Sequence, residues 1–271
     1  MTAATTETWP LSAAATQLLR DPKAAPRDLL KLALKELVLR GVWKLERDER
    51  PRRLGAPKIT LWLRDGDADV PQLPPLPMLD RSIRVEWRRG EGSMELTDVV
   101  KRLGHGIAGD VRDGAREELR ARGLLDVERR KVLGVVPRTV VTLTPSGASW
   151  QRASYEREEQ VEEAVRTLPG RQLAPQAAAL GGMVLLLSPG PLAELDHAMR
   201  RLGEEGYVPA SADGGAGAGT EWEFDLSFLD GIGDVVGSAF DGAFDSAVDA
   251  GGGGDGGGGD GGGGGDGGGG S

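Results

Sequence analysis

The chain has 271 residues and no cysteine, which excludes disulfides, thiolate nucleophiles and zinc–thiolate sites. Its formal charge of −9 is unevenly distributed, because all 33 Lys and Arg residues but only 28 of the 42 acids lie in residues 1–203. The other fourteen acids lie in residues 204–271, which contain no base. We therefore predict a basic folded domain over residues 1–203, with a net charge of about +5, followed by an acidic, glycine-rich tail.

The N-terminal residues lack the basic segment and apolar segment that together form a signal peptide. The most apolar stretch, residues 177–187, is too short to cross a bilayer. We therefore expect a cytoplasmic protein. Peripheral attachment to the inner face of the membrane is compatible with this location.

In residues 26–40 the leucines recur at helical spacing, Pro26 suits a first helical turn and Gly41 suits the position after the last one. This pattern predicts a helix over 26–40. Two short runs with alternating apolar residues follow, and they predict a hairpin with strands over 42–46 and 59–64.

A proline-rich stretch, residues 70–78, is interpreted as a linker. After it, Ile83, Val85 and Trp87 alternate with charged residues, which predicts a half-buried strand over 81–87. The later part of the domain is expected to contain a helix beginning after Ser93, a helix over 107–122, a second hairpin within 124–144, and helices over 146–168, 175–187 and 191–202.

An internal repeat connects the two hairpins, because residues 36–47 align without gaps to residues 118–129. In each copy a helix ends at a glycine and a two-stranded wing follows. The repeat predicts a mainly α fold with β-hairpins (α+β), formed by two winged-helix-like halves at about 24–66 and 80–144. A C-terminal helical layer over 146–202 completes the predicted domain.

The sequence gives little support for catalysis. Residues 104–109 form a GxGxxG pattern, but a dinucleotide site needs that loop directly after a buried strand, and the preceding residues are polar with helical spacing. We interpret the pattern as a glycine-containing break between two helices. His105 and His197 belong to no metal-binding motif. We therefore expect no cofactor, no metal site and no enzymatic activity.

Basic residues carry the clearer functional signal. Arg112, Arg116 and Arg120 are spaced four residues apart and share one helix face, which can bind the phosphates of an anionic lipid or of nucleic acid. The alternative is a solvated face on which neighbouring acids balance these charges. Those acids are Asp110, Asp113, Glu117 and Glu118.

All four phenylalanines of the chain lie in the tail. Phe228, Ile232, Phe240 and Phe244 recur at helical spacing among acids within residues 204–250. This segment is interpreted as an acidic amphipathic sequence that folds on a partner, and the basic domain of the same chain is one candidate partner. A hydrophobic helix docked permanently on the domain is the alternative. Residues 251–271 are almost all glycine and aspartate, and they are predicted to be a disordered spacer.

Residues 32–46 and 110–144 together resemble the Golgi phosphoprotein family, and in particular its bacterial members. The resemblance lies in the pattern LxxRGxL followed by ExRxxLGxxPxTxxxLT, it extends over residues 24–202, and the tail has no counterpart in the family.

The resemblance implies a mainly helical fold and a non-catalytic adaptor that binds phosphatidylinositol 4-phosphate on membranes. It also implies self-association through the hairpin at 127–144, for which the apolar candidates are Val132, Leu133, Val135 and Val136. The family's head-group pocket uses a Trp and three Arg, and the corresponding positions here are Asp21, Leu30, Gly109 and Arg112. Only Arg112 matches, and Trp9 and Arg20 are the candidates to replace the first two.

The sequence as a whole favours a non-catalytic adaptor whose partner is an anionic membrane lipid or a protein, with a second copy of the chain as a further partner through the second hairpin. A winged-helix-type nucleic-acid-binding protein is the first alternative, and it is disfavoured because acids interleave with the bases of each helix. A protein-interaction module regulated by its acidic tail is the second.

Overall fold

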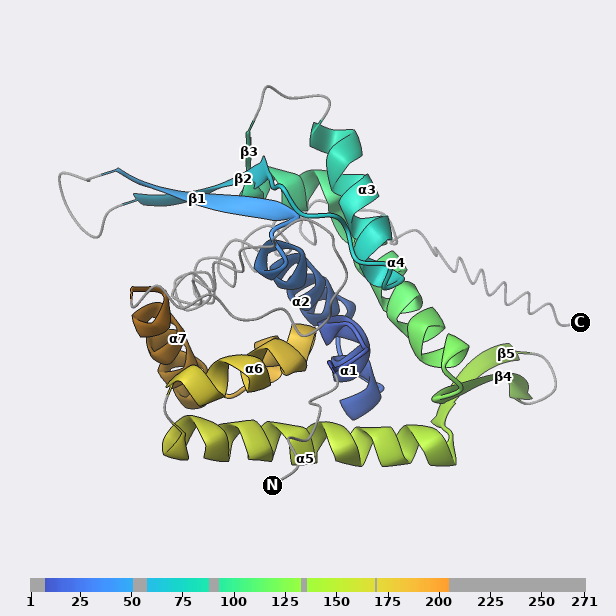
Figure 1. Cartoon of the computed structure of the whole chain (residues 1–271). Helices are drawn as coiled ribbons and strands as arrows, with labels where there is room; N and C mark the ends of the chain where they lie inside the picture. Colours follow the sequence, from blue (N-terminus) through green and yellow to red (C-terminus); the bar gives the residue numbers. More distant parts are fainter. Residues whose placement is uncertain (1–7, 51–57, 88–92, 133–135, 169, 205–271) are drawn as a thin grey trace, which may run out of the picture.

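A computed structural model describes residues 8–50, 58–87, 93–132, 136–168 and 170–204 (Figure 1). The fold is mainly α with two small antiparallel sheets, as the sequence predicts. The elements, in chain order, are α1 (Ala13–Arg20), α2 (Pro26–Leu39), β1 (Trp43–Arg50), β2 (Lys58–Asp65), α3 (Pro75–Trp87), β3 (Met94–Glu95), α4 (Leu96–Ala121), β4 (Leu125–Val132), β5 (Val136–Leu143), α5 (Pro145–Thr167), α6 (Gly170–Leu180), the 3-10 helix η1 (Gly181–Leu186) and α7 (Pro189–Glu204).

Helix α4 is the central element. Its 26 residues span about 39 Å at 1.5 Å per residue, and α1, α2 and α3 all pack against it. Helix α5 contacts α1, and α6, η1 and α7 complete the C-terminal layer at its side (Figure 1). Burial of apolar side chains from all of these helices and from strands of both sheets holds the domain together. The core residues include Leu18, Leu29, Leu37, Trp43, Leu63, Leu79, Ile83, Val111 and Leu119.

The two halves end their main helices in the same way. Gly41 and Gly123 follow α2 and α4 with φ of 69° and 68°, a left-handed conformation that glycine adopts at little cost. The residue after each glycine donates its N–H back into the helix, Val42 to the Leu37 carbonyl at 3.0 Å and Leu124 to the Leu119 carbonyl at 2.9 Å. These equivalent caps turn the chain into β1 and β4.

Each half then forms a hairpin of two eight-residue strands. In the first, Trp43 pairs with Asp65 at the base, and in the second, Leu125 pairs with Leu143. The first hairpin gains a third strand, because β3 pairs with β2 at Trp62. Both hairpins extend outward from the helices, on opposite sides in Figure 1.

The predicted strand over 81–87 is wrong, because these residues form the second half of α3. The alternation of Ile83 and Val85 suggested a strand, but Leu76, Leu79 and Ile83 also fit helical spacing and are fully buried. Val85 is 48% exposed, on the solvent side of the helix. The helix begins at Pro75, where a proline without an N–H is tolerated, so it takes up half of the predicted linker.

The predicted break at residues 104–109 is also wrong, because α4 runs through them without interruption. Each glycine in a helix costs up to about 1 kcal/mol relative to alanine. A buried stripe before and after the glycines, including Val99, Ile107, Val111 and Leu119, offsets this cost by packing α4 into the core. The GxGxxG pattern therefore lies inside a helix and forms no phosphate-binding loop.

Three smaller differences concern element boundaries. Helix α1 is not predicted by the sequence pattern, although Ser12 caps it by accepting the Ala15 N–H. The last turn of the predicted helix over 175–187 is the 3-10 helix η1, and α6 itself begins earlier, at Gly170. The helix predicted to begin after Ser93 begins at Leu96, because Glu95 is its N-cap and pairs in β3.

Two glycine substitutions are expected to have opposite effects on stability. A Cβ at Gly147 in α5 would overlap the carbonyl oxygen of Leu124, so Gly147→Ala should lower the free energy of unfolding by about 1–3 kcal/mol. A Cβ at Gly106 in α4 would meet no atom within 4 Å, so Gly106→Ala should raise the free energy of unfolding by up to about 1 kcal/mol. Urea unfolding of the two variants measures both changes, and changes of the same sign would contradict this account.

Candidate functional site

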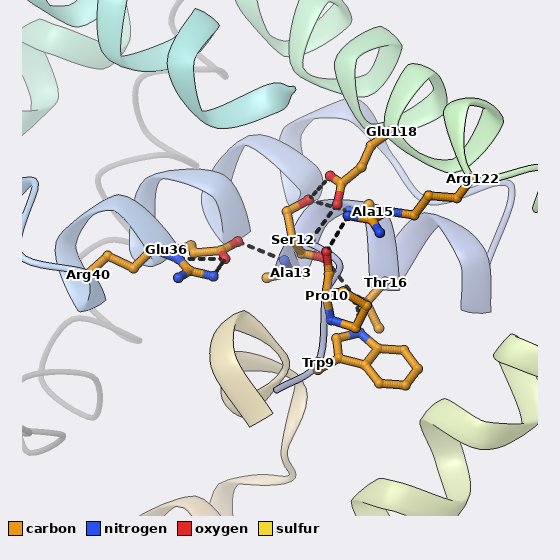
Figure 2. Close-up of polar contacts among 10 residues, drawn as sticks. All are labelled: Trp9, Pro10, Ser12, Ala13, Ala15, Thr16, Glu36, Arg40, Glu118 and Arg122. Carbon is orange, nitrogen blue, oxygen red and sulfur yellow. Dashed lines mark hydrogen bonds and ion pairs between the residues drawn. The ribbon is translucent and has the colours of Figure 1, made fainter. Parts of the chain in front are cut away.

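Two buried carboxylates hold the N-terminus of α1 (Figure 2). Glu118 of α4 accepts the Ser12 N–H at 2.9 Å through Oε1 and the Ser12 hydroxyl at 2.7 Å through Oε2. Glu36 of α2 accepts the Ala13 N–H at 2.7 Å through Oε2. Glu36 and Glu118 occupy equivalent positions in the internal repeat, so each half contributes one carboxylate to this clamp.

Charge and hydrogen bonding complete the clamp. Arg40 donates from Nε at 3.0 Å and from Nη2 at 2.7 Å to Glu36 Oε1, and its repeat equivalent Arg122 donates to the Pro10 carbonyl at 2.7 Å. Burial raises the pKa of Glu36, and the charge of Arg40 acts against this rise. Burial also raises the pKa of Glu118, and its hydrogen bonds from Ser12 act against that rise. Both side chains are almost inaccessible to solvent and face backbone amides, so the clamp is structural.

The clamp fixes α1 against α4 and thereby positions the loop that joins α1 to α2. At the other end of α1, Gln151 of α5 donates its amide to the carbonyls of Leu19 and Arg20, both at 3.0 Å. With α1 held at both ends, the loop residue Pro22 lies beside α4, where the carbonyl oxygen of Pro22 accepts from Arg112 Nη2 at 3.4 Å.

The three predicted arginines lie along α4 but have different environments. Arg112 adjoins the α1–α2 loop and is partly buried. Arg116 is also partly buried, with 29% of its side chain exposed, and its Nη1 lies 3.0 Å from Asp113 Oδ1. The side chain of Arg120 is 66% exposed and its Nη1 is 3.8 Å from Glu117 Oε2. The balanced-face alternative thus describes Arg116 and Arg120, but not Arg112.

Arg112 and Arg116 together form an arginine pair with unused donors. Burial, and then the neighbouring charge of Arg116, lower the pKa of Arg112. The Nε atoms of Arg112 and Arg116 are both buried without a hydrogen-bond partner, and no other buried side-chain donor or acceptor in the described residues is unpaired. Buried polar atoms are normally paired, so the arginine pair is short of acceptor oxygens, and an anion can approach it through the exposed part of Arg116, 29% of the side chain.

The other positions implied by the family resemblance do not add to this pair. Leu30 is 1% exposed and belongs to the core. Trp9 is 6% exposed, and its Nε1 donates to the Thr16 hydroxyl at 2.9 Å. Arg20 has 7% of its side chain exposed and forms an ion pair with Glu158 at 2.6 Å. Trp9 and Arg20 thus have partners of their own within the domain, and their role as replacements for the family's first two residues stays a prediction.

The other predicted sites lie partly or wholly outside the described residues. Val132 and Val136 are paired at the tip of the second hairpin, which fits the predicted hairpin but does not test self-association. Leu133 and Val135 lie outside the described residues, as do the four apolar tail positions, Phe228, Ile232, Phe240 and Phe244. Their roles remain predictions.

Sequence reasoning missed a hollow of about 310 Å³ on the outer face of the first hairpin. The strand register brings together residues 18 positions apart, since Arg64 Nη2 lies 2.8 Å from Glu46 Oε2. No local sequence pattern therefore indicates this hollow. Its charges largely cancel, which favours no particular ligand. The lining residues are Glu46, Asp48, Arg50, Trp62, Arg64 and Ser93.

In the part of the chain that the structure describes, no three His, Cys, Asp or Glu side chains converge as metal ligands would. None of the described helices combines the length and the apolar character that crossing a membrane requires. No protein-family model matches the chain, and no curated protein matches it either.

Proposed function

We propose that this protein is a non-catalytic adaptor that attaches to anionic membrane surfaces through the arginine pair, Arg112 and Arg116. The observation that carries the proposal is the two buried, unpartnered Nε atoms on adjacent turns of α4. The resemblance to the Golgi phosphoproteins supports the same class of function, because Arg112 coincides with one of that family's head-group ligands.

A phosphate group has the chemistry that this site requires. Its oxygens accept several N–H bonds, and guanidinium groups bind phosphate in bidentate geometry. Each basic residue near an anionic lipid surface contributes about 1 kcal/mol, so two arginines give weak attachment that salt reduces. Asp21 and Asp113 lie near the arginine pair and limit the affinity further. Because Arg112 alone matches the family pocket, the proposal concerns anionic head groups in general.

The arginine pair should account for most of the binding. In co-sedimentation at low salt, the full-length Arg112→Gln/Arg116→Gln variant is expected to bind anionic vesicles about thirtyfold more weakly than the unaltered protein, from about 1 kcal/mol per arginine. Neutral vesicles of phosphatidylcholine alone measure adhesion that does not depend on lipid charge. Vesicles of phosphatidylcholine with phosphatidylserine add the negative charge, so the difference in binding between the two measures its effect. Vesicles with phosphatidylinositol 4-phosphate test the family's lipid, and duplex DNA tests the nucleic-acid alternative.

A control variant with the same loss of charge is Arg27→Gln/Arg166→Gln. Both arginines are more than half exposed and lie in long ion pairs of 3.9 Å. If the control weakens binding as much as Arg112→Gln/Arg116→Gln, net charge and not the arginine pair is responsible. If the unaltered protein binds duplex DNA but no anionic vesicle, the adaptor proposal is wrong.

A further inference from the structure

We infer that the acidic tail of the same chain binds the arginine pair and competes there with anionic surfaces. This inference rests on the proposed function, because it concerns the regulation of the same site. The tail supplies the complementary charge, with fourteen acids and no base after residue 203. A carboxylate offers the same bidentate acceptor geometry to a guanidinium as a phosphate does.

In the described part of the domain, the arginine pair is the hydrogen-bond donor group best suited to the tail carboxylates. Several other arginines there already have a carboxylate: Arg40 pairs with Glu36, Arg64 with Glu46, and Arg84 with Asp80. Among the described residues Arg112 has no ion-pair partner and Arg116 keeps one, Asp113, at its Nη1, while the only two buried, unpaired side-chain atoms belong to these two arginines. A tail carboxylate that meets the exposed part of Arg116, 29% of its side chain, can bind there while the Arg116–Asp113 contact stays in place.

The tail is long enough to reach the arginine pair. Helix α7 ends at Glu204, and residues 205–271 follow. The 45 residues from 205 to 249 can span up to about 150 Å when extended. A domain of about 200 residues has a radius of gyration of about 16 Å, so a path over its surface to the opposite side is about 65 Å, well within that length. Tethering also gives the tail an effective concentration of about 1 mM.

The segment between residues 221 and 249 is the part that we assign to the contact. Its apolar positions, Phe228, Ile232, Phe240 and Phe244, recur at helical spacing among acids, so the segment can order when it meets a surface. Residues 251–271 have no apolar side chain and serve as a spacer. The eight acids of the segment are Glu221, Glu223, Asp225, Asp230, Asp234, Asp241, Asp245 and Asp249.

A spin label tests the contact directly. Because the chain has no cysteine, full-length Ser246→Cys takes a single nitroxide on the tail. We expect the label to broaden the backbone amide signals around Arg112 and Arg116, and we expect high salt to remove the effect. The broadening should disappear in Arg112→Gln/Arg116→Gln and persist in Arg27→Gln/Arg166→Gln. Broadening spread evenly over the domain, or unchanged by Arg112→Gln/Arg116→Gln, would overturn the inference.

Competition is tested by neutralising the eight acids to Asn or Gln in the full-length chain. If the tail contact has a Kd of about 0.1 mM, an effective concentration of about 1 mM blocks the site about nine times in ten, so neutralisation should strengthen binding to anionic vesicles about tenfold. The gain should vanish when Arg112→Gln/Arg116→Gln is added. An equal gain in that background would show long-range repulsion and would overturn the inference.

The two proposals fail in different ways. If the neutral-tail protein does not bind anionic vesicles, the proposed function fails, whatever the spin label shows. If vesicle binding depends on the arginine pair but the label shows no contact with α4 and neutralisation gives no gain, the tail inference alone fails.

Discussion

Glu36→Ala is expected to lower the free energy of unfolding by about 3–5 kcal/mol, because it removes one partner of a buried ion pair. Glu36 is 0% exposed and accepts hydrogen bonds from Arg40 and from the Ala13 N–H. Its loss leaves the Arg40 guanidinium, 19% exposed, without its carboxylate, and leaves an N–H at the start of α1 unpaired. Equilibrium unfolding in urea, followed by far-UV circular dichroism, measures the change.

The matched control is Glu46→Ala in the first hairpin. Its partner distance, 2.8 Å to Arg64, is close to the 2.7 Å between Glu36 and Arg40, but both side chains of the hairpin pair are 51% exposed. Exposed ion pairs contribute about 0–1 kcal/mol, so Glu46→Ala should change stability little. If the two variants lose similar stability, the clamp does not support α1 in the way that the geometry indicates.

Local signals predicted much of the fold. The helix predicted over 26–40 is α2, Pro26–Leu39, because apolar spacing and the glycine cap are properties of neighbouring residues. Alternating apolar runs predicted the first hairpin and the repeat connects it to the second, and the nearly equal φ values of Gly41 and Gly123 show why a glycine occurs in both copies. The prediction failed for residues 81–87, whose pattern of apolar residues fits both a strand and a helix. Only tertiary burial of Leu76 and Leu79 distinguishes the helix α3 from a strand over 81–87.

The candidate site was predictable only in part. Spacing alone places Arg112 and Arg116 on one face of α4, but their distinction from Arg120 depends on the α1–α2 loop, which the sequence does not place beside α4. The sequence also contains a signal for the clamp. Glu36 and Glu118 align in the repeat, on helices whose neighbouring positions are apolar, and a repeated acid in such a position suggests a buried, satisfied carboxylate.

Trp43→Ala is the second substitution with a large expected effect, about 3–5 kcal/mol in the free energy of unfolding. Trp43 begins β1, is 0% exposed and joins the first hairpin to α3. Its ring centroid lies 5.3 Å from that of Trp87 in an edge-on arrangement, and the guanidinium carbon of Arg84 lies 5.0 Å from the Trp43 centroid. Removal of the indole leaves a large cavity between the sheet and α3.

Two further variants separate the contributions. The Trp43 Nε1 donates to Asp80 Oδ1 at 2.9 Å, so Trp43→Phe keeps much of the apolar contact but leaves a buried acceptor short of one donor. Because Arg84 still donates to Asp80, we expect this variant to lose about 1–3 kcal/mol, less than Trp43→Ala. Trp62→Ala is the control on the opposite face of the same hairpin, where the indole is only partly buried. An equal loss in Trp43→Ala and Trp62→Ala would mean that the hairpin itself, and not its packing on α3, determines the stability.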